Sequence, residues 1–199
     1  MKKWYAGWIV AILLWSVIPA WAGAPLNTVQ ANVNRVLEIL RDPQLKGNAA
    51  KEVKKEKLRQ IYDVMFDKVE LSRRTLSRNW NSLNSAQRQE FVQLFRQVLE
   101  KAYVDKILDY AGEKVAFDRE TPLAENQAEI QTRIITASKE IPITYRVLLS
   151  GGQWRVYDVI VENVSLVLNY RTQFNEILEK NTPAQLIEIL RKKVAEQQS

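Results

Sequence analysis

The chain of 199 residues contains neither cysteine nor histidine. The absence of cysteine excludes disulfide bonds and the thioether-linked lipid that tethers a bacterial lipoprotein. Without either residue type the common metal sites, the Ser-His-Asp and Cys-His nucleophile systems and histidine acid–base catalysis are also excluded. We therefore predict a protein that is not an enzyme, has no metal or other cofactor, and acts by binding.

A strong charge of one sign is also lacking. There are 29 Lys and Arg residues against 23 Asp and Glu residues, a net charge of +6, which is too weak to predict a nucleic-acid partner. The hydrophobic content of 46% and charged content of 26% are ordinary for a soluble globular chain, and the length suits one domain with a sizeable core.

The N-terminus carries the one long hydrophobic run. Lys2 and Lys3 precede an apolar stretch from Trp4 to Ile18, Pro19 breaks it, and Ala20 and Ala22 supply small residues at a cleavage site. We predict a secretory signal peptide over residues 1–22 and a single domain over 23–199, with a net charge of +4 once Lys2 and Lys3 are removed. The alternative is an uncleaved anchor, but the run is shorter than the roughly 18 to 20 residues that span a bilayer. We therefore expect no stable membrane insertion.

The first half of the chain has helical spacing of its apolar residues. This spacing predicts helices over residues 27–42, 49–66 and 69–80, and a long helix from Asn84 to about Gly112. Asn84 and Gln87 have the spacing of a capping box. The charged run from Lys51 to Lys57 is either a patch for anionic headgroups or a solvated helix face, and its mixed signs favour the solvated face.

After Gly112 the pattern changes to that of strands. Four are predicted, over residues 115–117, 128–136, 141–149 and 154–161, and Gly151-Gly152 joins the last two in a tight hairpin. Helices then follow over 164–180 and from Pro183 onward. Helices segregated before and after the strands predict an α+β fold: a helical layer packed on a curved, mostly antiparallel four-stranded sheet, enclosing an apolar cavity.

The junction between sheet and helix is the most informative segment. Apolar residues from Trp154 to Val161 occupy both alternating sets, as in a strand that is apolar on both faces, and helical spacing begins at Val164. We expect the sheet to run straight into this helix at Glu162-Asn163. Asn163 suits both the left-handed backbone of such a corner and the cap of the following helix.

These residues also carry a resemblance to a known family. The segments Tyr157-Asp158-Val159, 164–167 (VSLV) and 169–174 (NYRTQF) are similar to the signature of the MlaC family, also called toluene-tolerance auxiliary proteins. The similarity extends upstream through residues 66–67, 71–73, 76–80 and 87–91. Asn163 and Ser77 stand where the family usually has glycine, and Thr172 stands where it has serine.

The resemblance implies a soluble carrier in the periplasm of a Gram-negative envelope. Members of this family bind the acyl chains of a glycerophospholipid in an apolar cavity and keep the headgroup largely outside. They carry the lipid between an inner-membrane ABC transporter complex and an outer-membrane lipoprotein–porin complex, which maintains the lipid asymmetry of the outer membrane. The phospholipid and these two complexes are therefore the expected partners.

Candidate site residues follow from bulk and from the faces of the predicted elements. The side chains expected to line a lipid cavity are Phe66, Phe91, Phe95, Leu99, Tyr103, Tyr145, Val147, Trp154, Val164, Val167, Leu168, Tyr170 and Phe174. Three arginines, Arg73, Arg78 and Arg171, are candidates for contact with the headgroup phosphate. Asp158 lies in a strongly apolar strand, where it is either a general base or, the interpretation we favour, an anchor for a turn or a backbone amide.

Three other functions stay open at this point. The ligand could be a hopanoid, because relatives of this family accompany hopanoid synthesis. The chain could also be a small α+β enzyme that acts on an apolar substrate, with Asp158 as its base. The third alternative is an envelope chaperone whose grooves bind protein chains.

Overall fold

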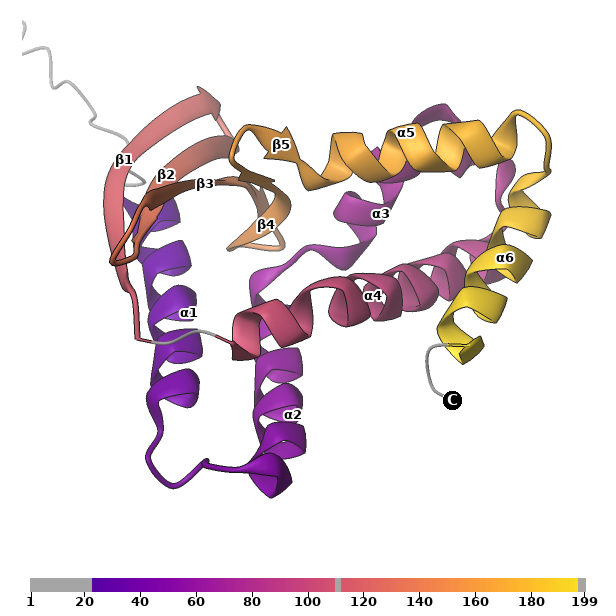
Figure 1. Ribbon diagram of the computed structural model, residues 1–199. Coiled ribbons are helices and arrows are strands. Elements are labelled where there is room, and N and C mark those ends of the chain that lie inside the picture. The colour runs from indigo at the N-terminus through magenta and orange to yellow at the C-terminus, as the bar shows by residue number, and fades with distance from the viewer. Residues whose placement is uncertain (1–22, 110–111, 197–199) are drawn as a thin grey trace, which may run out of the picture.

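The computed structural model describes residues 23–109 and 112–196 (Figure 1). The helices are α1 (Ala24–Arg41), α2 (Asn48–Met65), α3 (Lys68–Leu76), the 3-10 helix η1 (Ser77–Ser82), α4 (Ser85–Leu108), α5 (Leu166–Leu178) and α6 (Pro183–Glu196). The strands are β1 (Lys114–Ala124), β2 (Gln127–Ile135), β3 (Glu140–Ser150), β4 (Gln153–Val161) and β5 (Val164–Ser165). The predicted signal peptide lies outside the described residues, and none of the described helices has the length and apolarity to cross a membrane.

The strands form one antiparallel sheet in the order β1-β2-β3-β4-β5, which confirms the predicted α+β class. Figure 1 shows this sheet curling over α1, while α3 to α6 form a separate helical layer beside it. The sequence predicted four strands; the fifth, β5, has only two residues. Strand β1 is longer than the predicted 115–117. Its second half lies at the sheet edge, where Pro122 is tolerated, and lacks the apolar alternation that would have predicted a strand.

The structure has two apolar clusters, one between the sheet and helices α1 and α2, and one within the helical layer. The sheet cluster buries residues of α1, α2 and the sheet: Val29, Val33, Met65, Ala128, Ile130, Val147, Trp154 and Val156. The helical cluster buries residues of α3 to α6, of η1 and of the link between η1 and α4: Leu71, Leu76, Trp80, Leu83, Phe91, Val92, Leu94, Phe95, Val98, Leu99, Val167, Tyr170, Phe174, Leu186, Ile187 and Leu190. Phe66 packs against both clusters, so we call the contact zone around Phe66 the seam.

A β-bulge in β4 explains why this strand is apolar in both alternating sets. Val147 pairs with Val156, but the next residue back along β3, Arg146, pairs with Asp158, so Tyr157 is an extra residue. After the bulge Tyr145 pairs with Val159, which places Val156 and Val159 on the same face of the sheet. The expectation of a strand apolar on both faces was therefore wrong, because the bulge shifts the alternation by one residue.

The connection between α2 and α3 covers part of the outer edge of β4. The Asp67 backbone N–H donates to the Val156 carbonyl at 2.9 Å, and Phe66 forms an isolated parallel bridge with Val156. The Asp67 carboxylate also accepts from the Glu70 N–H at 2.9 Å, which caps the first turn of α3. One residue therefore fixes the start of α3 on the sheet.

Several local predictions are confirmed. Gly151 and Gly152 both have positive φ, as a two-residue hairpin requires. Asn84 and Gln87 form both hydrogen bonds of the capping box that begins α4. Residues of the Lys51–Lys57 run pair with carboxylates, as Lys55 does with Glu52 at 2.9 Å, which agrees with a solvated helix face.

Ser77 occupies a strained backbone position at the end of α3, with φ 52° and ψ −127°. Residues that carry a side chain rarely adopt this backbone conformation, whereas glycine does so at little cost. We expect Ser77→Gly to raise the free energy of unfolding by about 1 kcal/mol, measured by denaturant titration. Ser77→Ala is the control, because it removes the hydroxyl and keeps the strain. A gain in the alanine variant equal to that in the glycine variant would show that the backbone is not the cause.

Candidate functional site

Asp158 is the centre of the joint between the sheet and α5. Its side chain is only 3% exposed; one carboxylate oxygen accepts from the Ser165 hydroxyl at 2.6 Å and the other from the Val167 N–H at 3.0 Å. The Ser165 hydroxyl in turn accepts from the Leu168 N–H at 3.1 Å and caps α5. The favoured prediction of an anchoring role for Asp158 is confirmed, since both oxygens are used to hold the first turn of α5.

The corner before this joint is a tight turn with two left-handed residues, Glu162 (φ 48°) and Asn163 (φ 67°). The predicted positive φ of Asn163 is confirmed. The predicted cap was wrong, because Ser165 and not Asn163 caps the helix. The sheet also does not run straight into the helix, since Val164 and Ser165 first pair with β4 as the short strand β5.

Arginines connect this joint to α3. The Arg171 guanidinium of α5 donates to the Arg74 carbonyl from Nε at 3.0 Å and from Nη2 at 2.6 Å, which satisfies a carbonyl in the last turn of α3. The Arg74 guanidinium lies 3.9 Å from the centre of the Tyr157 ring, on the bulge of β4. The sequence signature that carries the family resemblance therefore encodes a three-way contact between the sheet, α3 and α5.

The residues predicted to line a lipid cavity separate into four groups. Six lie in the helical cluster: Phe91, Phe95, Leu99, Val167, Tyr170 and Phe174. Val147 and Trp154 lie in the sheet cluster. Phe66, Tyr103 and Tyr145 are partly buried, with Phe66 at the seam, Tyr103 against the helical cluster and Tyr145 against the sheet cluster. Val164 and Leu168 are 59% and 52% exposed on the outside of the joint.

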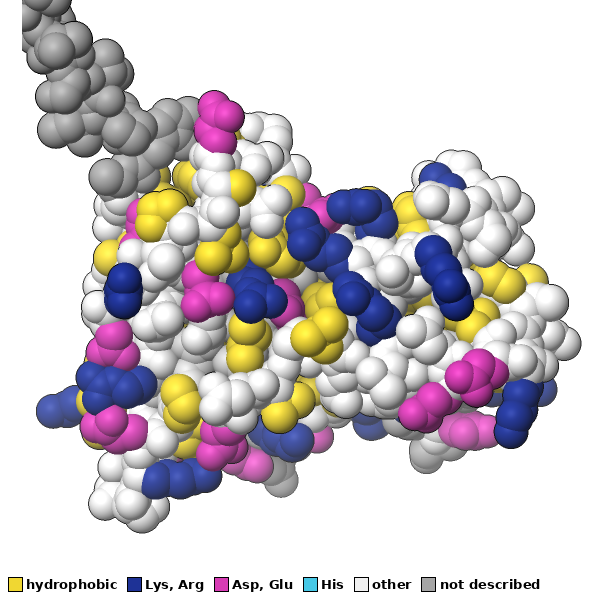
Figure 2. Space-filling model, turned by 90° about the horizontal axis from the view of Figure 1, so that it is seen from above, with side chains coloured by type: hydrophobic (Ala, Val, Ile, Leu, Met, Phe, Trp, Pro, Cys, Tyr) yellow, Lys and Arg dark blue, Asp and Glu magenta, His cyan; other side chains and the backbone are white. Residues whose placement is uncertain are grey.

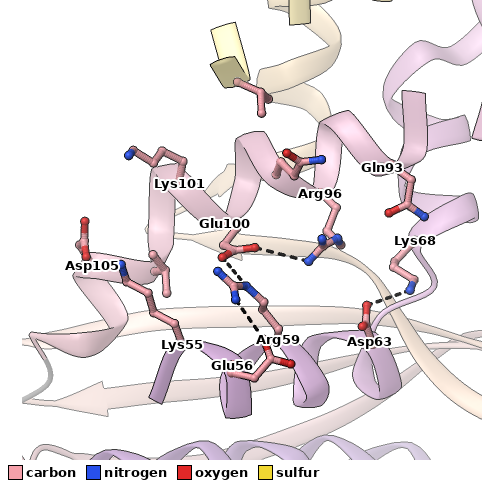
Figure 3. Close-up of a pocket in the computed structure, with 13 residues that line it drawn as sticks. Lys55, Glu56, Arg59, Asp63, Lys68, Gln93, Arg96, Glu100, Lys101 and Asp105 are labelled. Atoms are coloured by element: carbon pink, nitrogen blue, oxygen red, sulfur yellow. Dashed lines mark hydrogen bonds and ion pairs between the residues drawn. The ribbon is translucent and has the colours of Figure 1, made fainter. Parts of the chain in front are cut away.

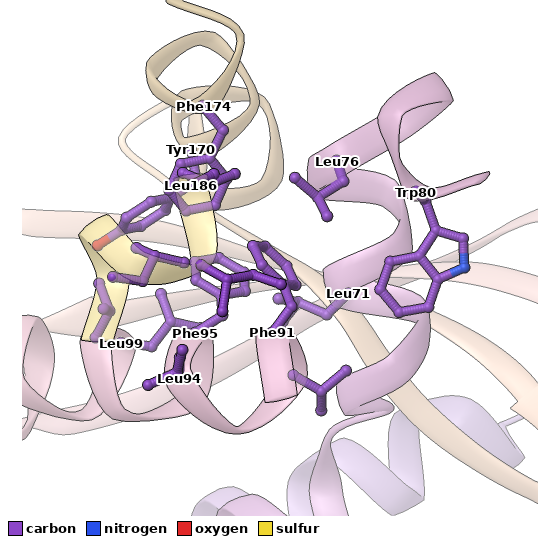
Figure 4. Close-up of a cluster of buried hydrophobic side chains, with 14 of the residues drawn as sticks. Leu71, Leu76, Trp80, Phe91, Leu94, Phe95, Leu99, Tyr170, Phe174 and Leu186 are labelled. Carbon is purple, nitrogen blue, oxygen red and sulfur yellow. The ribbon is translucent and has the colours of Figure 1, made fainter. Parts of the chain in front are cut away.

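The aromatic residues of the helical cluster pack on one another (Figure 4). The Phe95 ring meets the rings of Tyr170 and Phe174 edge to face, with centroids 5.0 and 5.4 Å apart, and the Phe91 ring meets that of Phe174 in the same way at 5.7 Å. Burial raises the pKa of the Tyr170 hydroxyl to about 12. These contacts make the centre of the helical cluster a packed core, and the seam is where apolar side chains of both layers meet.

A hollow of about 650 Å³ lies between α2 and α4, with Lys68 of α3 and Val194 of α6 at its border (Figure 3). Its lining is mostly charged, and ion pairs cross it, such as Arg59 Nε to Glu100 Oε1 at 2.6 Å. The hydrogen bonds that Arg59 donates to Glu56 and Glu100 raise the pKa of Arg59. Such partly exposed pairs contribute up to about 1 kcal/mol each, so α2 is held to α4 weakly in this region.

The three predicted headgroup arginines come together around a second hollow, of about 400 Å³. Arg73, Arg78 and Arg171 line it with Arg74, which the sequence analysis missed, and with Ser77 and Asn81. Glu70 pairs with both Arg73 and Arg74, and hydrogen bonds from these guanidiniums hold its pKa below the usual range. Arg73 and Arg74 follow Glu70 by three and four residues, so both lie on the same side of a helix as Glu70. This spacing was the signal for including Arg74 together with Arg73.

The architecture has a solved counterpart. A phospholipid-binding protein from Ralstonia solanacearum, solved in complex with a phospholipid, superposes with a TM-score of 0.75 and 22% sequence identity, covering 87% of this chain and 98% of that one. The chain thus has the α+β fold of a structurally characterised lipid-binding protein.

The chain belongs to the MlaC family: the family profile, described as MlaC protein, matches residues 30–192. The intermembrane phospholipid transport system binding protein MlaC of Haemophilus influenzae is 27% identical over 112 residues, or 54% of this chain and about half (52%) of that protein. The toluene tolerance protein ttg2D of Pseudomonas putida is 20% identical over 177 residues, or 88% of this chain and 82% of that protein.

Proposed function

We propose that the protein is a periplasmic carrier that binds a glycerophospholipid and moves it between the two membranes of a Gram-negative envelope. The observation that carries this proposal is the family match over residues 30–192, combined with a relative named for intermembrane phospholipid transport. The fold shared with a protein solved in complex with a phospholipid supports it.

The acyl chains enter between the sheet cluster and the helical cluster, at the seam. Phe66 supplies partly buried apolar surface there, while Tyr103 lies against the helical cluster and Tyr145 against the sheet cluster. Burial raises the pKa of the Tyr145 hydroxyl to about 12. Weak ion pairs, rather than apolar packing, face each other across the neighbouring hollow between α2 and α4. The two layers therefore separate at this side at low cost, while the joint at Asp158 holds them together at the other.

A carrier is needed because the lipid tails cannot cross water unaided. At about 0.8 kcal/mol per methylene, two chains of roughly 16 carbons oppose transfer into water by on the order of 25 kcal/mol. An apolar interior removes this cost, and uptake and release then require only a small bias from docking at each membrane. This transfer requires no covalent chemistry. Asp158, the candidate general base, instead holds the first turn of α5 with both carboxylate oxygens.

The headgroup lies outside the apolar interior, within reach of Arg73, Arg78 and Arg171. The inner-membrane ABC transporter complex and the outer-membrane lipoprotein–porin complex are the proposed sites of loading and release. The predicted signal peptide over residues 1–22 delivers the chain to the periplasm, and its removal leaves residues 23–199 as the carrier.

Native mass spectrometry of protein purified from envelope extracts tests the ligand. We expect a second species, heavier than the polypeptide by the mass of a glycerophospholipid. Phe66→Ser should reduce the lipid-bound fraction several-fold, because it removes apolar surface at the seam, whereas the control Val69→Ser alters a residue that is already 55% exposed and should leave this fraction unchanged.

A polypeptide mass alone after gentle preparation would contradict the carrier proposal. A bound mass matching a triterpenoid would assign the ligand to the hopanoid class, and a bound peptide would favour the chaperone alternative.

A further inference from the structure

Four arginines form a basic face beside the joint. Arg73, Arg74 and Arg78 come from the end of α3 and from η1, Arg171 comes from α5, and all four border the hollow of about 400 Å³. Figure 2 shows Lys and Arg side chains gathered over the first part of α5, with hydrophobic side chains next to them. We call Arg73, Arg74, Arg78 and Arg171 the arginine face.

The charge of the arginine face is only partly neutralised. Among the described residues, Glu70 is the one acid that forms an ion pair with it, and Glu70 serves both Arg73 and Arg74. Arg171 bonds a backbone carbonyl, and Arg78 is exposed. About three positive charges therefore remain around one hollow, and because they are guanidinium groups they persist over the whole physiological pH range.

Exposed aliphatic side chains lie beside these charges. Leu168 is 52% exposed and precedes Arg171 by three positions in α5, so the two residues share a face of the helix. Val164 is 59% exposed and pairs with Val161, itself 38% exposed, at the adjoining corner of the sheet. Large aliphatic residues exposed next to several arginines are typical of surfaces that lie in a membrane interface.

We propose that the arginine face, with Leu168 and Val164, docks the protein reversibly on an anionic phospholipid membrane. Arg78 contacts a lipid phosphate with its guanidinium fork, and Arg73, Arg74 and Arg171 contribute charge and the N–H groups that they do not use within the protein. The hollow between the four arginines receives a phosphate group. The aliphatic side chains enter the boundary between headgroups and acyl chains. An acidic protein surface matches the charge alone, whereas a bilayer matches both the charge and the exposed aliphatic residues.

Co-sedimentation of the purified protein with vesicles tests this proposal. At low salt we expect binding to vesicles of phosphatidylcholine mixed with phosphatidylglycerol and little binding to phosphatidylcholine alone. The double variant Arg73→Gln/Arg78→Gln should weaken the partition into anionic vesicles roughly tenfold or more, since each basic residue near such a surface contributes to attraction. Leu168→Ser should weaken binding several-fold.

Matched controls lie on α6. Lys192→Gln/Lys193→Gln removes the same charge from exposed positions, and Ile189→Ser changes an aliphatic residue that is 36% exposed, so neither should alter binding. An equal loss in the lysine variant would show a general charge effect and overturn the proposal. Absence of wild-type binding to anionic vesicles would also overturn it, and so would binding to immobilised polyglutamate without binding to vesicles, which would assign the face to an acidic protein.

The docking proposal shares Arg73, Arg78 and Arg171 with the proposed headgroup contact, but docking of the wild-type protein does not require a lipid in the interior. A failure of docking leaves the lipid-bound species seen by native mass spectrometry unchanged, and a protein without bound lipid can still sediment with vesicles. The two experiments therefore separate the failure of one proposal from the failure of the other.

Discussion

Asp158→Ala is expected to lower the free energy of unfolding by about 3 to 5 kcal/mol, because two hydrogen bonds to a buried carboxylate are lost together. The substitution leaves the Ser165 hydroxyl and the Val167 N–H without their acceptor at a buried position. Since these groups form the first turn of α5, the contact between sheet and helical layer weakens as a whole. Denaturant unfolding followed by circular dichroism measures the change.

Asp118→Ala is the matched control for this experiment. Asp118 also lies in a strand, but its ion pair with Arg133 is partly exposed, so its loss should cost less than about 1 kcal/mol. Ser165→Ala should lie between the two, at about 1 to 2 kcal/mol, because it removes the helix cap and one bond to Asp158. If Asp158→Ala were as stable as the Asp118 variant, the anchoring role of Asp158 would be wrong.

Phe95→Ala should cost about 3 to 5 kcal/mol of stability, as truncation of a fully packed aromatic side chain does. Phe95 is 1% exposed, and its ring packs against those of Tyr170 and Phe174 from the opposite helix. The sequence analysis placed Phe95 among the lipid-lining residues, whereas its contacts are those of a core residue. We therefore expect this substitution to lower the unfolding temperature and the free energy of unfolding clearly, and to change the lipid-bound fraction of the folded protein little.

Phe95→Leu is the conservative comparison and should cost about 1.5 kcal/mol, since it fills most of the volume but loses the edge-to-face contacts. Leu168→Ala, at an exposed position of α5, should change stability by no more than about 0.5 kcal/mol. A Phe95→Ala protein of nearly wild-type stability that has lost its lipid would instead place Phe95 at the lipid surface.

The helices of this protein were largely predictable, because their signals are local. The apolar spacing gave α1, α2 and α4 to within a few residues, and Asn84 with Gln87 marked the start of α4. The signal for the hairpin at Gly151-Gly152 was equally local, since a two-residue turn of this type requires two adjacent residues with positive φ.

What the sequence did not reveal depends on pairing between strands. The extra residue Tyr157 shifts the in–out alternation of side chains along β4. This shift is visible only from the pairing of β4 with Val147 and Arg146 of β3. The strand β5 was missed for a similar reason, because a two-residue strand has no period of its own. Its presence depends on the tight turn at Glu162 and Asn163.

The candidate site remains a prediction, and the structure bears only on how its residues are grouped. Arg73, Arg78 and Arg171 were predicted together as headgroup contacts, and the fold brings them to one hollow with Arg74. The large apolar residues were selected as one set, yet Phe91 and Trp154 belong to different clusters. Apolar spacing tells that a side chain is buried, but it does not tell which partner buries it.

The attachment of Asp67 to Val156 has a consequence for how the chain acquires its structure. Asp67, which caps the start of α3, is positioned by a strand that comes much later in the chain. Helix α3 therefore takes its place against the sheet only once β4 has formed. Contacts of such large sequence separation slow folding, because the long intervening segment loses conformational entropy before the stabilising contact forms. We therefore expect α3 to reach its final position late in folding, after β4 has formed, although its own helical hydrogen bonds are local.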